Sequence, residues 1–366
     1  MNALTFFALT CSVLSMGFLS CSADVKEMGP TVDEIEIIEK DDAAEPEIGY
    51  DECLEMAGVT ELMAQKALDY ISATQTDDES LYNCVYVYAP SLETYADEPE
   101  KLAARIALLG FKGVYLSPGG NRLTTQDQWL RTFISTCTGL GLDVYATFYE
   151  DPSVFVSQAG ADASLDKFLT YNRSVSYEER FAGVSADLEP HTIKEDIGLG
   201  WTWDTQNHNG AGGQNDCLLK VTLDRLDYAQ SKLYGLSLHE AIWWNYQNMY
   251  NEGKVTYGDV NQFTEVCDWV SIMAYRNTTD GVWSYSEPTL KACSSEDCVN
   301  ICVKTATNDE ASTTLMPNGW KALLETMSVL RDKGLEYGCF NGLDMFQYEA
   351  LETMWEWKED NEYNAE

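Results

Sequence analysis

Two acidic residues separated by a single position, Asp187 and Glu189, are the part of this sequence best suited to chemistry. They lie at the end of an apolar stretch, 182–188, that predicts a buried β-strand. Because side chains alternate between the two faces of a strand, both carboxylates point the same way. Two like charges held close together push their pKa values apart, as acid catalysis requires. The competing interpretation is a strand end with two solvated acids, since the chain has 60 acidic residues.

Short apolar runs alternate with stretches of helical spacing along most of the chain. The runs that predict strands are 84–89, 113–117, 142–148, 182–188, 240–244, 269–275, 299–306 and 338–346. A helix over 51–74 precedes them, and helices over 100–109, 125–138, 165–179, 216–233, 260–266, around Leu290, 320–332 and 349–357 follow them in turn. About eight strand–helix units over roughly 280 residues is the size of a single-domain (β/α)8 TIM barrel.

The composition of these strands supports a barrel of the α/β class. Continuous rather than alternating apolar runs fit a parallel sheet that is covered on both faces. The alternative is an open doubly wound sheet, but no glycine-rich dinucleotide loop follows the first strand. We therefore expect the barrel and no cofactor.

Active sites of such barrels lie at the carboxyl ends of the strands, so the residues at those ends are candidates for substrate binding. They are Glu150, Trp244, Asn245, Arg276, Phe346 and Gln347, together with Trp201 and Trp203 in the long loop after the fourth strand. Acids, aromatic rings and amides on one rim suit a sugar, whose apolar faces stack on rings. The competing interpretation of the loop tryptophans is that they pack their own loop onto the barrel. Of Trp243 and Trp244, at most one can face the interior.

The fourth strand carries a resemblance to a known family. Residues 181–189 are similar to the signature of the chitinase-like glycoside hydrolases, which include chitinases and endo-β-N-acetylglucosaminidases. That signature has three aspartates before its glutamate. Ala182 and Ser185 replace the first two aspartates here, whereas Asp187 and Glu189 are kept.

Two further strands extend this resemblance, which covers roughly residues 83–358 in the order of its elements. Residues 273–275 are similar to the family's Met-x-Tyr motif, with Arg276 where its chitinases carry Asp. Residues 342–346 resemble its last strand, with Phe346 where a Trp forms the floor of the sugar subsite.

The resemblance implies a glycosidase that uses the N-acetyl group of its own substrate. Glu189 would be the general acid, Asp187 would orient the N-acetyl group, and Tyr275 would hydrogen-bond the ring that this group forms. A mechanism with two protein carboxylates would instead need Glu150, Asp309 or Glu310 as the partner. The rival function is a catalytically inactive, lectin-like carbohydrate-binding protein on the same barrel, because fold alone does not separate the two. A catalytic Glu189 should be partly buried and face a cleft.

Composition limits the range of partners. The formal net charge of −37 argues against nucleic acid, whose phosphates are neutralised by Lys and Arg. The three histidines, His191, His208 and His239, lie apart from the cysteine cluster at 293–302, so we expect no metal site. An oligo- or polysaccharide remains the expected partner.

The first residues predict export. Residues 1–22 have the apolar core of a signal peptide, and Leu19-Ser20-Cys21 resembles the end of a bacterial lipoprotein signal, which would place a lipid anchor on Cys21. A plain signal peptide is the alternative. Residues 23–50 predict an acidic flexible linker and residues 51–366 the barrel domain. We expect the protein to be extracellular or held at the cell surface.

Overall fold

A computed structural model describes residues 48–76, 81–119, 121–125, 127–149, 151–206, 210–306 and 310–355. The predicted signal, the linker up to residue 47, Cys21, Glu150 and Asp309 lie outside the described residues. Among the described residues, no helix is long and apolar enough to cross a membrane. The same residues contain no group of three or more His, Cys, Asp or Glu side chains that could hold a metal ion.

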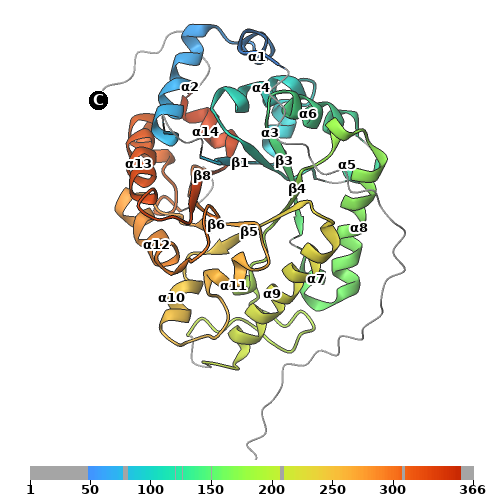
Figure 1. The fold of residues 1–366 in the computed structure, drawn as a ribbon, viewed down its shortest axis with the longest axis vertical. Helices are drawn as coiled ribbons and strands as arrows, with labels where there is room; N and C mark the ends of the chain where they lie inside the picture. The colour runs from blue at the N-terminus through green and yellow to red at the C-terminus, as the bar shows by residue number, and fades with distance from the viewer. Residues whose placement is uncertain are drawn as a thin grey trace, which may run out of the picture. The chain divides into compact units, whose positions relative to one another are not determined.

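Eight parallel strands close into a barrel in sequence order, which confirms the predicted fold class (Figure 1). Each strand pairs with its successor, and β8 closes the ring on β1 through Val85 and Met345. The strands are β1 (Cys84–Val87), β2 (Gly113–Leu116), β3 (Asp143–Tyr149), β4 (Gly183–Ala186), β5 (Ser237–Trp243), β6 (Trp269–Met273), β7 (Val299–Lys304) and β8 (Phe340–Phe346).

Helices surround the ring of strands in Figure 1. They are α1 (Tyr50–Ala57), α2 (Glu61–Thr74), α3 (Ala89–Thr94), α4 (Pro99–Leu108), α5 (Arg122–Thr125), α6 (Gln128–Gly139), α7 (Pro152–Val156), α8 (Gln158–Ser174), α9 (Gln214–Leu233), α10 (Tyr246–Asn251), α11 (Val260–Thr264), α12 (Thr279–Ala292), α13 (Gly319–Gly334) and α14 (Tyr348–Trp355). The 3-10 turns are η1 (Tyr177–Glu179), η2 (Pro190–Thr192) and η3 (Met316–Asn318).

Several boundaries differ from those expected from the sequence. The fourth strand ends at Ala186 rather than at residue 188, so Asp187 follows the strand, as Glu189 does, instead of lying in it.

Two further differences concern the first helix and the fifth strand. The single helix predicted over 51–74 is two helices, because Gly58 takes a left-handed φ of 65° that ends α1 and Thr60 caps the start of α2. The fifth strand starts at Ser237 rather than at residue 240, so Glu240 lies in the middle of β5.

A chain of hydrogen bonds crosses the barrel interior. Asp344 on β8 accepts from the Cys84 amide at 2.8 Å and from Asn300 Nδ2 at 2.7 Å, and also from Ser271 Oγ. Ser271 contacts His239 Nε2 at 2.7 Å, and His239 Nδ1 lies 2.9 Å from Ser185 Oγ on β4. Burial raises the pKa of Asp344 to about 6. Burial also holds the pKa of His239 well below its ordinary value. A neutral imidazole therefore connects β6 to β4.

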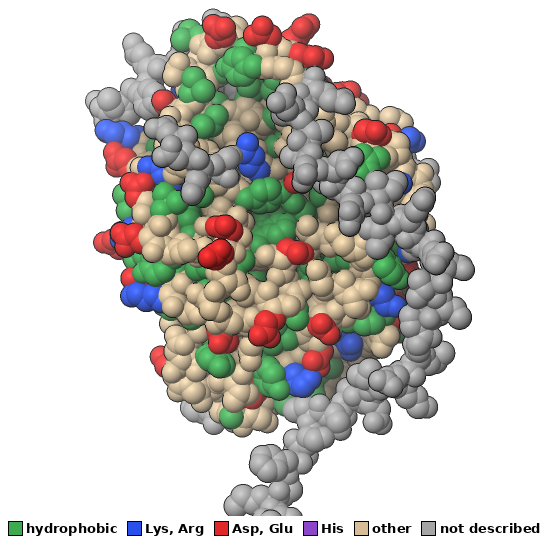
Figure 2. Space-filling model, viewed as in Figure 1, with side chains coloured by type: hydrophobic (Ala, Val, Ile, Leu, Met, Phe, Trp, Pro, Cys, Tyr) green, Lys and Arg blue, Asp and Glu red, His purple; other side chains and the backbone are tan. Residues whose placement is uncertain are grey.

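The surface is predominantly acidic, in keeping with the net charge of −37. Figure 2 shows acidic side chains scattered over this face with fewer basic ones between them, and hydrophobic side chains grouped near its middle. Such a surface repels anionic polymers.

Gly183 sets the distance between β4 and β5. A Cβ at this position would lie 2.1 Å from the carbonyl oxygen of Ser237 on β5. No such contact is tolerated between backbone atoms, so β4, which leads to Asp187 and Glu189, requires glycine here.

Gly183→Ala should therefore destabilise the barrel by about 3 kcal/mol, the upper part of the range for overpacked sites. Urea unfolding followed by tryptophan fluorescence measures the change. Gly338→Ala is the matched control, because a Cβ there meets no atom within 4 Å. Equal stability of the two variants would show that β4 and β5 can separate without cost.

Candidate active site at the carboxyl ends of the strands

The backbone after β4 is fixed by a short turn. The strand ends at Ala186, and Glu189 stands at the start of η2. The carbonyl oxygen of Glu189 accepts from the amide of Thr192 at 2.9 Å and from its hydroxyl at 2.8 Å. Pro190, at the first position of the turn, has no amide hydrogen to leave unsatisfied. The local sequence thus holds both acids at the rim.

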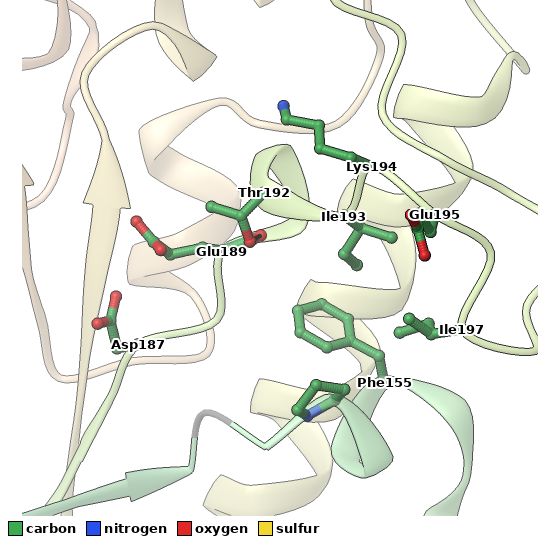
Figure 3. Close-up of a pocket in the computed structure, with 9 residues that line it drawn as sticks. Phe155, Asp187, Glu189, Thr192, Ile193, Lys194, Glu195 and Ile197 are labelled. Carbon is green, nitrogen blue, oxygen red and sulfur yellow. Dashed lines mark hydrogen bonds between the residues drawn. The ribbon is translucent and has the colours of Figure 1, made fainter.

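Asp187 and Glu189 border a hollow of about 520 Å³. It is lined by Pro152, Phe155, Asp187, Glu189, Thr192, Ile193, Lys194, Glu195 and Ile197. In Figure 3 both carboxylates turn to the same side, away from Phe155 and Ile197. The Glu189 side chain is 34% exposed, so this acid is partly buried at the edge of the hollow.

Tyr275 and Phe346 form an aromatic surface at the same end of the barrel. Their ring centroids are 5.6 Å apart, and Tyr88 lies 5.5 Å from Phe346. Lys304 at the end of β7 places its ammonium 4.9 Å from the Tyr275 ring and 5.2 Å from the Phe346 ring. The Phe346–Gln347 peptide bond is cis. The ends of β6, β7 and β8 thus meet around two rings.

Electrostatics connect this aromatic surface to the acids. Burial raises the pKa of Tyr275 well above its ordinary value, and the neighbouring Cys302 and the Asp187 carboxylate add to the shift. Tyr275 therefore keeps its phenolic proton and can donate a hydrogen bond near Asp187. Of the residues selected from the sequence, Asp187 and Glu189 line the same hollow, Tyr275 packs against Phe346, and the charge of Asp187 affects the pKa of Tyr275.

His191 is a neutral neighbour of Glu189. Its Nε2 lies 3.7 Å from Glu189 Oε1, and its Nδ1 lies 2.8 Å from the hydroxyl of Tyr246. The ring stacks on Trp243 with centroids 4.6 Å apart. Burial lowers the pKa of His191 to about 4, with the charge of Lys194 adding to the shift. At neutral pH the imidazole therefore brings no positive charge that would favour the ionised form of Glu189.

The predicted tryptophans serve packing more than the rim. Trp203 is only 6% exposed and lies against Trp243, Tyr246 and His191. This burial agrees with the alternative in which the loop packs its own aromatic residues. Trp201 is half-buried.

The remaining candidates lie further along the rim. Trp244 stacks on Tyr285 of α12 with centroids 3.6 Å apart. The guanidinium of Arg276 lies 5.1 Å from the same Tyr285 ring. Asn245 starts α10. The backbone oxygen of Gln347 accepts from Leu351 in α14, at 3.2 Å. Glu150 lies outside the described residues.

Sequence reasoning missed Glu240, a carboxyl beside the pair. It is 1% exposed, and its Oε1 accepts from the amide of Leu188 at 3.1 Å. Burial raises its pKa well above the ordinary value, and the charges of Asp187 and Glu189 add to the shift. The available signal was an acid within an apolar run, hidden because the strand was predicted to start at that residue.

Sequence comparison matches the chain to no protein-family model and to no curated protein. Solved structures similar to the chain include a GH18 chitinase from Pseudoalteromonas aurantia, with 13% identity, a TM-score of 0.48 and coverage of 75% of this chain and 97% of that one. The PgaB (BpsB) glycoside hydrolase domain from Bordetella bronchiseptica has 11% identity, a TM-score of 0.46 and coverage of 74% and 95%. An endo-β-N-acetylglucosaminidase from Cordyceps militaris has 12% identity, a TM-score of 0.40 and coverage of 77% and 85%.

The depressed pKa of His191 makes stability depend on pH. The unfolded imidazole binds a proton as the pH falls through 6.5, whereas the folded one resists until about 4. The native state should therefore lose stability across this window, by about 2–3 kcal/mol. His191→Gln lacks this titration.

Urea unfolding at pH 7 and pH 4.5 measures the effect, and comparing wild type with His191→Gln cancels the titration of all other groups. We expect the wild type to lose more stability than the variant on acidification. A difference between the two proteins that does not change with pH would contradict a neutral His191.

Proposed function

We propose that the barrel is a glycoside hydrolase that acts on a glycan containing an N-acetylhexosamine, with Glu189 as general acid. The observation that carries the proposal is the arrangement after β4, where Asp187 and Glu189 border a hollow and the charge of Asp187 reaches Tyr275. A partly buried acid, an orienting carboxylate and a protonated phenol at one strand-end rim are the groups that substrate-assisted cleavage needs.

In the first step Glu189 gives its proton to the glycosidic oxygen. The bond between that oxygen and the anomeric carbon breaks, and the carbonyl oxygen of the substrate's N-acetyl group forms a new bond to the anomeric carbon. Asp187 accepts the hydrogen bond of the N-acetyl N–H and stabilises its developing positive charge. The hydroxyl of Tyr275 donates a hydrogen bond to the ring so formed.

In the second step water attacks the anomeric carbon, and the Glu189 carboxylate takes the proton of that water. The bond to the acetyl oxygen breaks and the N-acetyl group is restored. Two displacements at one carbon retain its configuration, and Glu189 is protonated again for the next cycle. The neutral His191 and the Phe346 ring fit this scheme: the first brings no positive charge that would favour ionised Glu189, and the second offers an apolar surface for the sugar.

The second candidate is a carbohydrate-binding protein without activity. Its support is the loss of two carboxylates from the stretch around β4, since Ala182 and Ser185 stand where the chitinase-like family has Asp. A binding site could keep the aromatic surface and lose the chemistry.

Glu189→Gln should lower kcat at least about 100-fold, because a general acid contributes about that much or more. The assay follows release of reducing sugar or a chromogenic aglycone from N-acetylglucosaminides and neutral β-glycans. Glu336→Gln is the control, an exposed acid near the start of β8, at the other end of the barrel. Glycan binding without turnover by either protein would favour the second candidate.

Asp187→Asn should lower kcat on N-acetylated substrates about 10- to 1,000-fold, since the amide cannot offset positive charge on the N-acetyl group. Matched aryl glycosides with an N-acetyl or a hydroxyl group at the sugar's second carbon separate the two mechanisms. The wild type should cleave only the N-acetylated member. Equal turnover of both would point to a second protein carboxylate instead.

A further inference from the structure

Glu240 lies on the outer side of the barrel wall, behind the two acids. Its neighbour His239 faces the interior, where it contacts Ser185 and Ser271, so the alternation of β5 turns Glu240 outward. Register pairs Glu240 with Ala186, the last residue of β4. The carboxyl is thus buried beside the backbone that leads to the active-site rim.

The Glu240 side chain takes the place of a backbone hydrogen bond between β4 and β5. The pairing of β4 with β5 ends at Ala186, and within the part of the chain that the structure describes the Leu188 amide beyond it has no backbone partner. Glu240 Oε1 accepts from this amide at 3.1 Å. Leu188 lies between Asp187 and Glu189, so this bond holds the stretch of backbone that carries both acids.

The surroundings keep Glu240 uncharged. Burial raises its pKa well above the ordinary value, and negative charge on Asp187 and Glu189 adds to the shift. The other titratable groups that sense its charge are Tyr149 on β3, Tyr246 on α10 and Cys267 before β6. Each is itself neutral, because burial raises its pKa. Oε2 has no hydrogen-bond partner among the described residues. A buried carboxyl kept without a full set of partners points to a role beyond packing.

We propose that Glu240 is the positioning residue of this site: by holding the Leu188 amide, it fixes Asp187 and Glu189 in their catalytic directions. The inference rests on the proposed function. It also adds a third carboxyl beside the two acids, because positions 182 and 185, occupied by Ala182 and Ser185, supply none. The carboxyl comes from the neighbouring strand and acts on the backbone rather than on the substrate.

Two variants test this role. Glu240→Leu keeps the size of the buried group and removes the acceptor, whereas Glu240→Gln keeps the acceptor. Amide hydrogen exchange of a peptide spanning residues 186–190 reports the Leu188 bond directly. We expect exchange about 10- to 100-fold faster in the Leu variant, the factor for an unmade buried hydrogen bond, and near wild-type exchange in the Gln variant.

Kinetics give the second readout. With wild type and Glu189→Gln as references, Glu240→Leu should lose about 10- to 100-fold in kcat with KM within about threefold, since misplacing reacting groups costs the chemical step. Glu240→Gln should rescue kcat. Unchanged exchange at Leu188 in the Leu variant, or loss of kcat in both variants alike, would overturn the proposal. If the wild type cleaves no substrate, the proposed function fails, and the exchange measurement still decides whether Glu240 holds Leu188.

Discussion

The barrel depends on one buried carboxyl, that of Asp344, because its hydrogen bonds join strands that are far apart in the sequence. Donors reach it from β1, β6 and β7, and the hydroxyl of Tyr115 on β2 lies 3.3 Å away. A buried acid with this many donors specifies one arrangement of the strands around it, since any other would leave it unsatisfied. Ser271 and His239 then extend the network to Ser185 on β4.

The candidate site lies at the end of that network. Ser185 and Asp187 share the inward face of the chain, and the two acids are held from both sides of the barrel wall. On the inner side, His239 contacts Ser185 and anchors the strand that leads to them. On the outer side, Glu240 holds the amide between them. Interior packing and rim chemistry are thus connected through the short strand β4.

Sequence periodicity predicted the strands and their order, because buried parallel strands are continuous apolar runs and barrels place them in sequence order. It also selected Asp187, Glu189, Tyr275 and Phe346, which lie at or shortly after strand ends. It did not separate Trp203 from a surface residue, since its packing depends on the distant Trp243 and Tyr246. Glu240 was not selected for a related reason. Its role depends on the register between neighbouring strands, which the pattern of a single strand does not contain.

The most direct test of Glu189 as general acid is to measure how the loss of activity in Glu189→Gln depends on the leaving group of the substrate. Kinetics of wild type and Glu189→Gln are compared on aryl N-acetylglucosaminides whose leaving phenols range from strongly acidic to weakly acidic. A phenol that leaves readily needs no proton. We therefore expect the loss of kcat in Glu189→Gln to be small for the most acidic phenol and to grow to at least about 100-fold for the least acidic. A defect of the same size across the series would contradict proton donation by Glu189 and assign it another role.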